Sequence, residues 1–322
     1  MNTPVAFFIF KRPDTTEKVF EAIRQAKPSR LLVVADGPRP DRVGEADRCA
    51  ASRAIINCVD WDCEVLTNYS DTNLGCKYRL ASGLDWVFNT VEEAIILEDD
   101  CLPHPSFFGF CEELLDRYRD DNRIFLISGQ NVQKKQRATG ADYYFSRYTH
   151  CWGWASWRRA WQHYDVDMKL WPIFRDRQLL HATLADDSYA LKVWNQIFQR
   201  MVDQPIDTWD YQLQFAAWTQ SAMSILSNVK LVENIGFGVD GTHTTGTQNF
   251  YAEIPVREVT LPLHHPPFVV RDRVADRFTQ RTLYDYQSNL FKRVFSKIQR
   301  VNRHFLPSTW KLTTDSHESF TS

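Results

Sequence analysis

The chain has 322 residues, of which 43% are hydrophobic, so it is long enough for one large α/β domain or for two halves that share a core. Its net charge of −2 excludes the strongly basic composition typical of nucleic-acid binding, and we predict no nucleic-acid partner. The seven cysteines are odd in number and include no Cys-x-x-Cys pair, so we expect reduced thiols and no zinc or disulfide framework.

The first ten residues lack the basic start and the cleavage site of a signal peptide, and their apolar run is too short to span a bilayer. We therefore expect a first strand there. The reduced cysteines favour a cytoplasmic protein.

The first part of the chain alternates strand and helix patterns, as βα units do. This order predicts a mostly parallel sheet with helices on its faces, and a shared edge where the loops after the strands meet. The predicted strands are 5–10, 31–35, 63–66 and 94–97, and the predicted helices are 15–26, one around 50–55, and 76–88.

Three consecutive carboxylates, Glu98, Asp99 and Asp100, follow the predicted strand 94–97 directly. Ligands of parallel sheets bind just beyond the carboxyl ends of the strands, and three acids repel one another there unless a cation lies among them. Oxygen ligands favour Mg²⁺ or Mn²⁺. The alternative is a solvated acidic turn.

The second part of the chain is less regular. Trp154, Trp157 and Trp161 recur at helical spacing, which predicts a helix with an aromatic stripe toward the core, and Trp152 precedes it. A glycine-rich loop spans 236–244. The further predicted elements are helices at 107–118, 188–201 and 209–219 and strands at 124–128 and 224–232.

The tail from about residue 285 has apolar residues on one helical face and basic residues on the rest. Such a helix either lies in a membrane interface, which would make the protein peripheral on the cytoplasmic face of the membrane, or docks on protein.

The acidic triplet, a basic loop at Lys11-Arg12 and Asp36-Gly37 after the second strand together predict a site for a nucleoside diphosphate. A cation would neutralise the diphosphate, basic side chains would help to hold it, and Asp36 could accept the N3–H of a uracil.

These motifs resemble a glycosyltransferase of the GT-A fold, in particular the N-acetylglucosaminyltransferase I group and bacterial family-2-like relatives. In this resemblance Glu98-Asp99-Asp100 is the Glu-Asp-Asp version of the Asp-x-Asp motif, and the matching order covers roughly residues 4–250. The other stretches that carry it are 77–84, 106–108, 127–131, 152–154, 209–210 and 236–243.

The resemblance implies a GT-A, Rossmann-like α/β fold with an acceptor-side α+β half and a C-terminal helical tail. The expected divisions are 1–128 for the nucleotide-sugar half, 129–262 for the acceptor and catalytic half, and 263–322 for the extension. It also implies a metal-dependent enzyme that moves a hexose, such as N-acetylglucosamine, from a UDP-sugar to a glycan or glycoconjugate hydroxyl.

The resemblance assigns roles to individual residues. Asp100 would bind Mn²⁺ or Mg²⁺, and Asp210 would be the catalytic base, standing where the family has two acids in a Trp-Asp-Asp stretch. The donor-binding residues would be Arg12, Asp36, Arg79, Glu98 and Asp99.

Three further residues are expected at the site. His243 would be either a second metal or phosphate ligand or a structural polar residue. Trp152 and Trp209 would bind the acceptor, because sugar rings stack on aromatic faces.

The chemistry expected is displacement at the anomeric carbon, with one base on the acceptor hydroxyl and inversion of configuration. Two alternatives remain at this stage. One is a sugar nucleotidyltransferase, although Phe10-Lys11-Arg12-Pro13 lacks the glycine such enzymes use after the first strand. The other is a non-catalytic sugar-binding or scaffold protein.

Overall fold

The structure, a computed structural model, describes residues 1–134, 140–204, 206–236 and 253–284. The chain divides into two compact units, Met1–Thr279 and Gln280–Ser322. Of the second unit the structure describes Gln280–Tyr284, a π-helical turn (η2). The basic amphipathic helix predicted from residue 285 onward lies outside the described residues.

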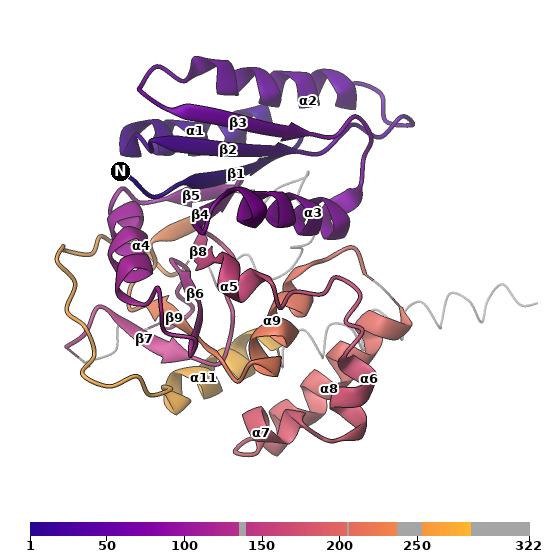
Figure 1. Ribbon diagram of the computed structural model, residues 1–322, viewed down its shortest axis with the longest axis vertical. Coiled ribbons are helices and arrows are strands. Elements are labelled where there is room, and N and C mark those ends of the chain that lie inside the picture. Colours follow the sequence, from indigo (N-terminus) through magenta and orange to yellow (C-terminus); the bar gives the residue numbers. More distant parts are fainter. Residues whose placement is uncertain (135–139, 205, 237–252, 285–322) are drawn as a thin grey trace, which may run out of the picture. The chain divides into compact units, whose positions relative to one another are not determined.

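The first unit is built on an eight-stranded sheet with the order β3-β2-β1-β4-β8-β6-β9-β7 (Figure 1). The pairs among β1 to β4 and the pair β6–β9 are parallel, whereas β8 and β7 run antiparallel to their neighbours. The predicted α/β class, with a mostly parallel sheet flanked by helices, is confirmed. The strands are β1 Val5–Ile9, β2 Arg30–Ala35, β3 Glu64–Tyr69, β4 Glu93–Glu98, β6 Ile124–Ser128, β7 Tyr143–Ser146, β8 Trp154–Trp157 and β9 Met223–Ser227.

A second, two-stranded antiparallel sheet pairs β5 (Cys101–Pro103) with β10 (Val232–Asn234). It brings the chain after β9 back to the turn that follows β4. The helices in the described residues of the first unit are α1 Pro13–Ala26, α2 Glu45–Ala54, α3 Gly75–Thr90, α4 Ser106–Arg117, α5 Arg158–Trp161, α6 Trp171–Asp176, α7 Leu180–Leu184, α8 Ser188–Asp203, α9 Asp210–Thr219 and α11 Arg273–Thr279, with the 3₁₀ turn η1 at Ile55–Cys58.

The two faces of the sheet carry separate hydrophobic clusters, because successive strand side chains point to opposite faces. Phe7 and its neighbours on one face pack with α1 and α4, and Phe8 and its neighbours on the other face pack with α3 and α9. Helices therefore cover both faces, and the polar ligand edge is left to the loops at the carboxyl ends of β1 to β4.

The helix predicted around Trp154, Trp157 and Trp161 is wrong. Trp154–Trp157 form strand β8, hydrogen-bonded between β4 and β6, and a single helical turn, α5, begins only at Arg158. Trp154 and Trp157 consequently lie on opposite faces, one in each hydrophobic cluster. Because both faces of β8 are buried, its sequence shows no alternation of polar and apolar residues. The spacing of its tryptophans therefore matched a helical period.

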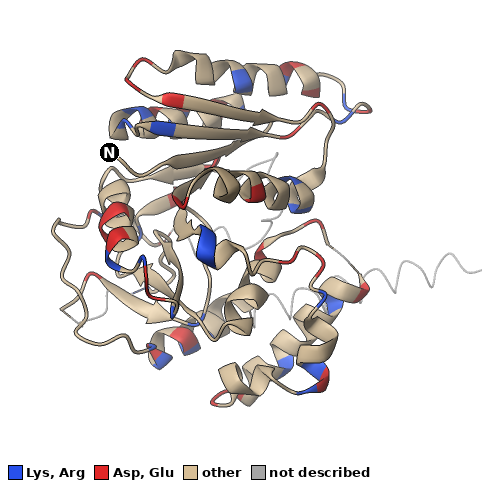
Figure 2. Ribbon diagram, in the orientation of Figure 1, with Lys and Arg blue, Asp and Glu red and all other residues tan. Residues whose placement is uncertain are grey.

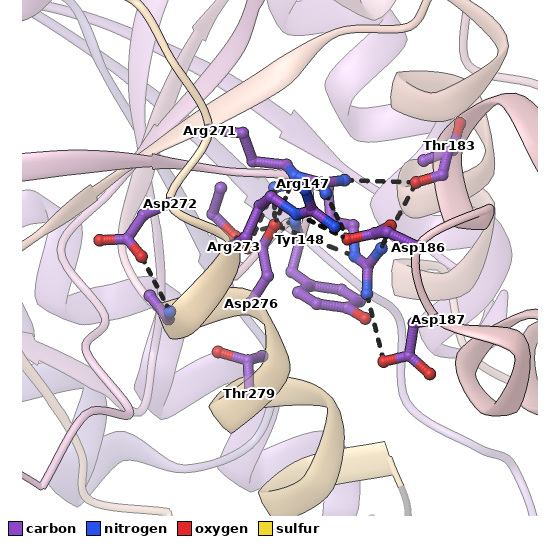
Figure 3. A network of polar contacts seen from close by, with 12 residues as sticks. Arg147, Tyr148, Thr183, Asp186, Asp187, Arg271, Asp272, Arg273, Asp276 and Thr279 are labelled. Atoms are coloured by element: carbon purple, nitrogen blue, oxygen red, sulfur yellow. Dashed lines mark hydrogen bonds and ion pairs between the residues drawn. The ribbon is translucent and has the colours of Figure 1, made fainter.

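A buried ion-pair network fastens the helices α7 and α8 to the sheet (Figure 3). The Arg147 side chain, only 4% exposed, pairs through Nη1 with Asp186 at 3.1 Å, and Arg271 Nη2 pairs with the same carboxylate at 2.7 Å. The carbonyl oxygen of Arg147 accepts hydrogen bonds from Gln214 and Trp218 on α9. The network thus fixes the end of α9 that is remote from Asp210.

Charges of both signs are interspersed over the helices in the view of Figure 2. Within the described part of the chain, no helix is both long and apolar enough to cross a membrane.

Candidate active site at the carboxyl edge of the sheet

The acidic triplet lies where the sequence analysis placed it, at the carboxyl end of β4. Glu98 is the last residue of β4 and is in register with Phe8 of β1. Asp99 is 3% exposed, whereas the side chain of Asp100 is 16% exposed. The three carboxylates therefore lie at the edge of the sheet, and Asp100 is more exposed to solvent than Asp99.

Arg12, from the loop after β1, pairs with two of these acids. Its Nη2 donates to Asp99 Oδ1 and lies 3.0 Å from Asp100 Oδ2, while the main-chain N–H of Phe10 donates to Asp99 Oδ2 at 3.1 Å. Burial acts to lower the pKa of Arg12, but the charges of Asp99 and Asp100 outweigh it and raise that pKa above its ordinary value. Arg12 therefore stays charged.

The charge of the triplet is compensated only in part by Arg12. Burial, followed by the charges of Asp100 and Asp99, raises the pKa of Glu98 well above its ordinary value. Asp210 is also among the charges that raise this pKa, so the proposed base lies within electrostatic reach of the triplet. The site has excess negative charge, which favours a bound cation.

Gly236 passes directly over the Arg12–Asp100 pair. The main-chain N–H of Ile235 donates to the carbonyl oxygen of Asp100 at 2.8 Å, which holds the start of the glycine-rich loop against the triplet. A Cβ on Gly236 would lie 2.7 Å from Arg12 Nη1 and closer still to Asp100 Oδ2. Any larger residue at this position would force the side chains of Arg12 and Asp100 to move, so the close approach favours glycine.

Asp36, at the end of β2, is saturated by hydrogen bonds from the protein. Its carboxylate accepts from the main-chain N–H groups of Gly37 and Leu74 at 2.9 Å, of Gly75 at 3.1 Å, and from Asn73 Nδ2 at 2.9 Å. Burial raises the pKa of Asp36, against the lowering effect of the three amides. The role predicted for Asp36 in reading a base stays a prediction.

Asp207 was not singled out from the sequence, yet it binds the start of α3 from the loop that leads to Asp210. Its carboxylate accepts from the main-chain N–H groups of Cys76 at 3.1 Å and Lys77 at 2.7 Å. Together with Asp36 it engages four successive amides at the beginning of this helix. Because the helix N-terminus is already occupied by carboxylates, it is not open to a phosphate.

Asp210 begins α9 and accepts a hydrogen bond from Thr208 Oγ1 at 2.5 Å. The Asp207 interaction therefore links the loop of Asp210 to the helix whose start lies beside Asp36. A carboxylate held this way, near the acidic triplet, can remove a proton from a hydroxyl placed between them. Nothing in the sequence around Asp207 marks this role, because its partners on α3 are 130 and 131 residues away.

The other predicted donor residue, Arg79, is buried at 6% exposure. It donates to the carbonyl oxygen of Ala35 at 3.2 Å and to Asn68 Oδ1 at 2.8 Å, and so joins the carboxyl ends of β2 and β3. Burial lowers its pKa, against the charge of Asp36. A direct contact of Arg79 with a donor stays a prediction.

The two predicted acceptor-binding tryptophans differ in exposure. Trp209 is 3% exposed and stacks on Trp154 with ring centroids 5.7 Å apart, so its ring belongs to the core. Trp152 is half-buried, and its main-chain N–H donates to Gln130 Oε1 at 3.4 Å. The acceptor-binding roles stay predictions, and Trp152 is the more exposed of the two residues. His243 lies outside the described residues.

The described side chains at this edge provide some, but not all, of the ligands that a divalent cation needs. In the described ranges no group of three or more His, Cys, Asp and Glu side chains is arranged to hold a metal ion. Asp100 nonetheless presents a partly exposed carboxylate in a region of excess negative charge, which is the chemistry that Mg²⁺ and Mn²⁺ prefer. A cation here would complete its coordination with a ligand's phosphates and with solvent.

No protein-family model matches the chain, and no curated protein matches it in sequence. Among solved structures, it is similar to mouse xyloside xylosyltransferase 1 in its apo form, with 11% identity over 67% of this chain and 81% of that chain and a TM-score of 0.35. The galactosyltransferase LgtC, in complex with donor and acceptor sugar analogues, shows 11% identity over 86% and 94% of the two chains, with a TM-score of 0.36.

UDP-glucose pyrophosphorylase, complexed with UDP-glucose, shows 11% identity over 79% of this chain and 97% of that chain, with a TM-score of 0.38. Glycosyltransferases, the class that the sequence resembles, are therefore among the solved structures similar to this chain. A pyrophosphorylase is among them as well.

Proposed function

We propose that the protein is a metal-dependent glycosyltransferase that moves a hexose from a UDP-sugar to a hydroxyl of a glycan or glycoconjugate. The observation that carries this proposal is the arrangement of Arg12 and the triplet Glu98-Asp99-Asp100 at the carboxyl edge of the sheet, with Asp210 within electrostatic reach. N-acetylglucosamine or a related hexose is the sugar that the sequence resemblance implies.

The donor diphosphate would bind beside Asp100 and Arg12. Asp100, with His243 as a candidate second ligand, would hold Mn²⁺ or Mg²⁺, which supplies charge neutralisation for the departing diphosphate. Arg12, whose Nη2 lies between Asp99 and Asp100, would donate its remaining guanidinium N–H groups to phosphate oxygens. Glu98 and Asp99 would lie toward the sugar and ribose.

The acceptor would bind on the side of Asp210 and Trp152. The Asp210 carboxylate would take the proton of the acceptor hydroxyl as that oxygen attacks the anomeric carbon. The new glycosidic bond forms as the bond from the anomeric carbon to the diphosphate oxygen breaks, and a single displacement inverts the configuration. Correct placement of the two substrates would contribute much of the rate.

A panel of UDP-sugars, incubated with the purified protein and Mn²⁺ or Mg²⁺, tests this proposal through the product released. Free UDP from at least one UDP-sugar supports a transferase. Release of pyrophosphate in the presence of a nucleoside triphosphate and a sugar phosphate would instead assign a nucleotidyltransferase. Binding of a UDP-sugar with no turnover would leave a sugar-binding protein.

Two variants assign the residues in the same assay. Asp100→Asn is expected to lose metal-dependent donor binding and turnover together. Asp210→Asn is expected to bind UDP with the wild-type affinity and to transfer little sugar, because it lacks the base but keeps the diphosphate site. Wild-type turnover by Asp210→Asn would exclude Asp210 as the base.

A further inference from the structure

The side chain that Asp36 holds offers a hydrogen-bond acceptor that the protein leaves unused. Asn73 Nδ2 donates both to Asp36 Oδ2 and to the carbonyl oxygen of Gly37, each at 2.9 Å. Both partners are acceptors only, so the nitrogen of the amide must face them and the oxygen must face away. Among the described residues, no donor binds Asn73 Oδ1.

The orientation of Asn73 is firmly set. It lies in the loop between β3 and α3, and the main-chain N–H groups of the next two residues, Leu74 and Gly75, are bound by the same Asp36 carboxylate. The loop is also tight against the end of β2, since a Cβ on Gly37 would lie 2.5 Å from the main-chain carbon of Thr72. Asn73 Oδ1 is therefore a preorganised acceptor, at a half-buried position.

The distance along the sheet edge suits a nucleoside diphosphate. Asn73 stands at the ends of β2 and β3, whereas Arg12 and Asp100 stand at the ends of β1 and β4. Two strand spacings separate β2 from β4, which is about 10 Å. A nucleoside that extends along this edge from a diphosphate bound at Arg12 would therefore reach the neighbourhood of Asn73.

We propose that Asn73 reads the base of the nucleotide donor, by accepting the N3–H of uracil at Oδ1. This proposal rests on the proposed function, and it makes Asp36 a positioning residue that acts on the base through Asn73. The four hydrogen bonds on the Asp36 carboxylate leave it no acceptor position for the base itself. An aspartate in place of Asn73 could not do this, because its carboxylate would face that of Asp36.

Titration calorimetry with UDP and with N3-methyl-UDP, both with Mn²⁺, tests the proposal on the intact protein. The wild type is expected to bind UDP about tenfold more tightly than N3-methyl-UDP, as the loss of one buried hydrogen bond implies. In Asn73→Ala this ratio should fall close to one, mainly through weaker binding of UDP. Thr72→Ala, in the same loop and without a side-chain hydrogen bond among the described residues, should keep the wild-type ratio.

Asn73→Leu provides a second variant, because leucine keeps the branched shape of the side chain and has no hydrogen-bond acceptor. It should lose the discrimination as Asn73→Ala does. A wild type that binds both nucleotides equally, or an Asn73→Leu protein that keeps the tenfold preference, overturns the assignment of Asn73 while leaving the proposed function intact. Failure of the wild type to bind UDP at all overturns both.

Discussion

Replacing Asp207 by alanine tests whether the loop of Asp210 is held by the N-terminus of α3. Asp207 accepts the main-chain N–H groups of Cys76 and Lys77, and loss of a capping carboxylate costs about 0.5–2 kcal/mol. The carboxylate also interacts with the helix dipole, which adds up to about 1 kcal/mol. We therefore expect Asp207→Ala to lower the free energy of unfolding by about 2 kcal/mol.

The assay is urea unfolding combined with transfer kinetics. With a denaturant slope of about 3 kcal/mol/M, the midpoint should fall by roughly 0.7 M. Because a displaced base costs up to about 100-fold in rate, kcat for transfer should fall by about 10- to 100-fold, while KM for the donor should change less than about twofold. The donor site itself does not include Asp207.

Asp203→Ala is the matched control for this experiment. Asp203 is an exposed carboxylate at the end of α8 that accepts a hydrogen bond from Gln199, four residues earlier on the same helix. Its variant should keep both the wild-type midpoint and kcat. Equal midpoints and equal kcat for the Asp207 and Asp203 variants would refute the reasoning.

Three further predictions concern Gly236, His150 and Arg12. Gly236→Ala should weaken metal-dependent UDP binding at least about tenfold, because its Cβ would displace the side chains of Arg12 and Asp100. UDP binding with the wild-type affinity would contradict this prediction. Burial lowers the pKa of His150 to about 4, so the folded protein favours the neutral imidazole. The stability that this neutral side chain contributes is full above the unfolded pKa of 6.5 and is lost as the pH falls from 6.5 toward 4. Wild type should accordingly lose about 3 kcal/mol more than His150→Leu over that pH range in urea unfolding, and parallel pH profiles would show that His150 titrates normally. Arg12→Gln should lower the free energy of unfolding at pH 8 by about 3 kcal/mol, because it leaves the buried Asp99 carboxylate without its charge partner. The loss should be smaller at pH 5, because burial raises the pKa of Asp99 to about 6 and the carboxyl is then mostly protonated. A loss that is the same at both pH values would contradict this prediction.

The parallel half of the sheet and its ligand edge could be predicted from the sequence. Strands β2 and β4 contain apolar runs that are followed directly by acidic residues, Asp36 after β2 and Glu98 at the end of β4, and β6 (Ile124–Ser128) has the predicted bounds. The placement of Arg12 and the triplet at one edge follows from the βα order alone, since the carboxyl ends of successive parallel strands meet. Local pattern and topology point to the same arrangement in this half of the chain.

The antiparallel half could not be predicted in the same way. Strand β8 is buried on both faces and inserted between β4 and β6, so its tryptophan spacing carried no information about the strand. Strand β7, Tyr143–Ser146, is four residues long and gave no periodic signal. The roles of Asn73 and Asp207 depend on partners that only the folded chain brings near, and a sequence pattern does not contain them.

The central claim is that Asp100 and Arg12 bind a nucleoside diphosphate together with a divalent cation. Titration calorimetry of UDP against wild type and Asp100→Asn, each with Mn²⁺ and with a chelator, measures this directly. The account predicts that the wild type binds UDP at least tenfold more tightly with Mn²⁺ than with the chelator, and that Asp100→Asn loses this dependence. Equal UDP binding by both proteins under both conditions would contradict it.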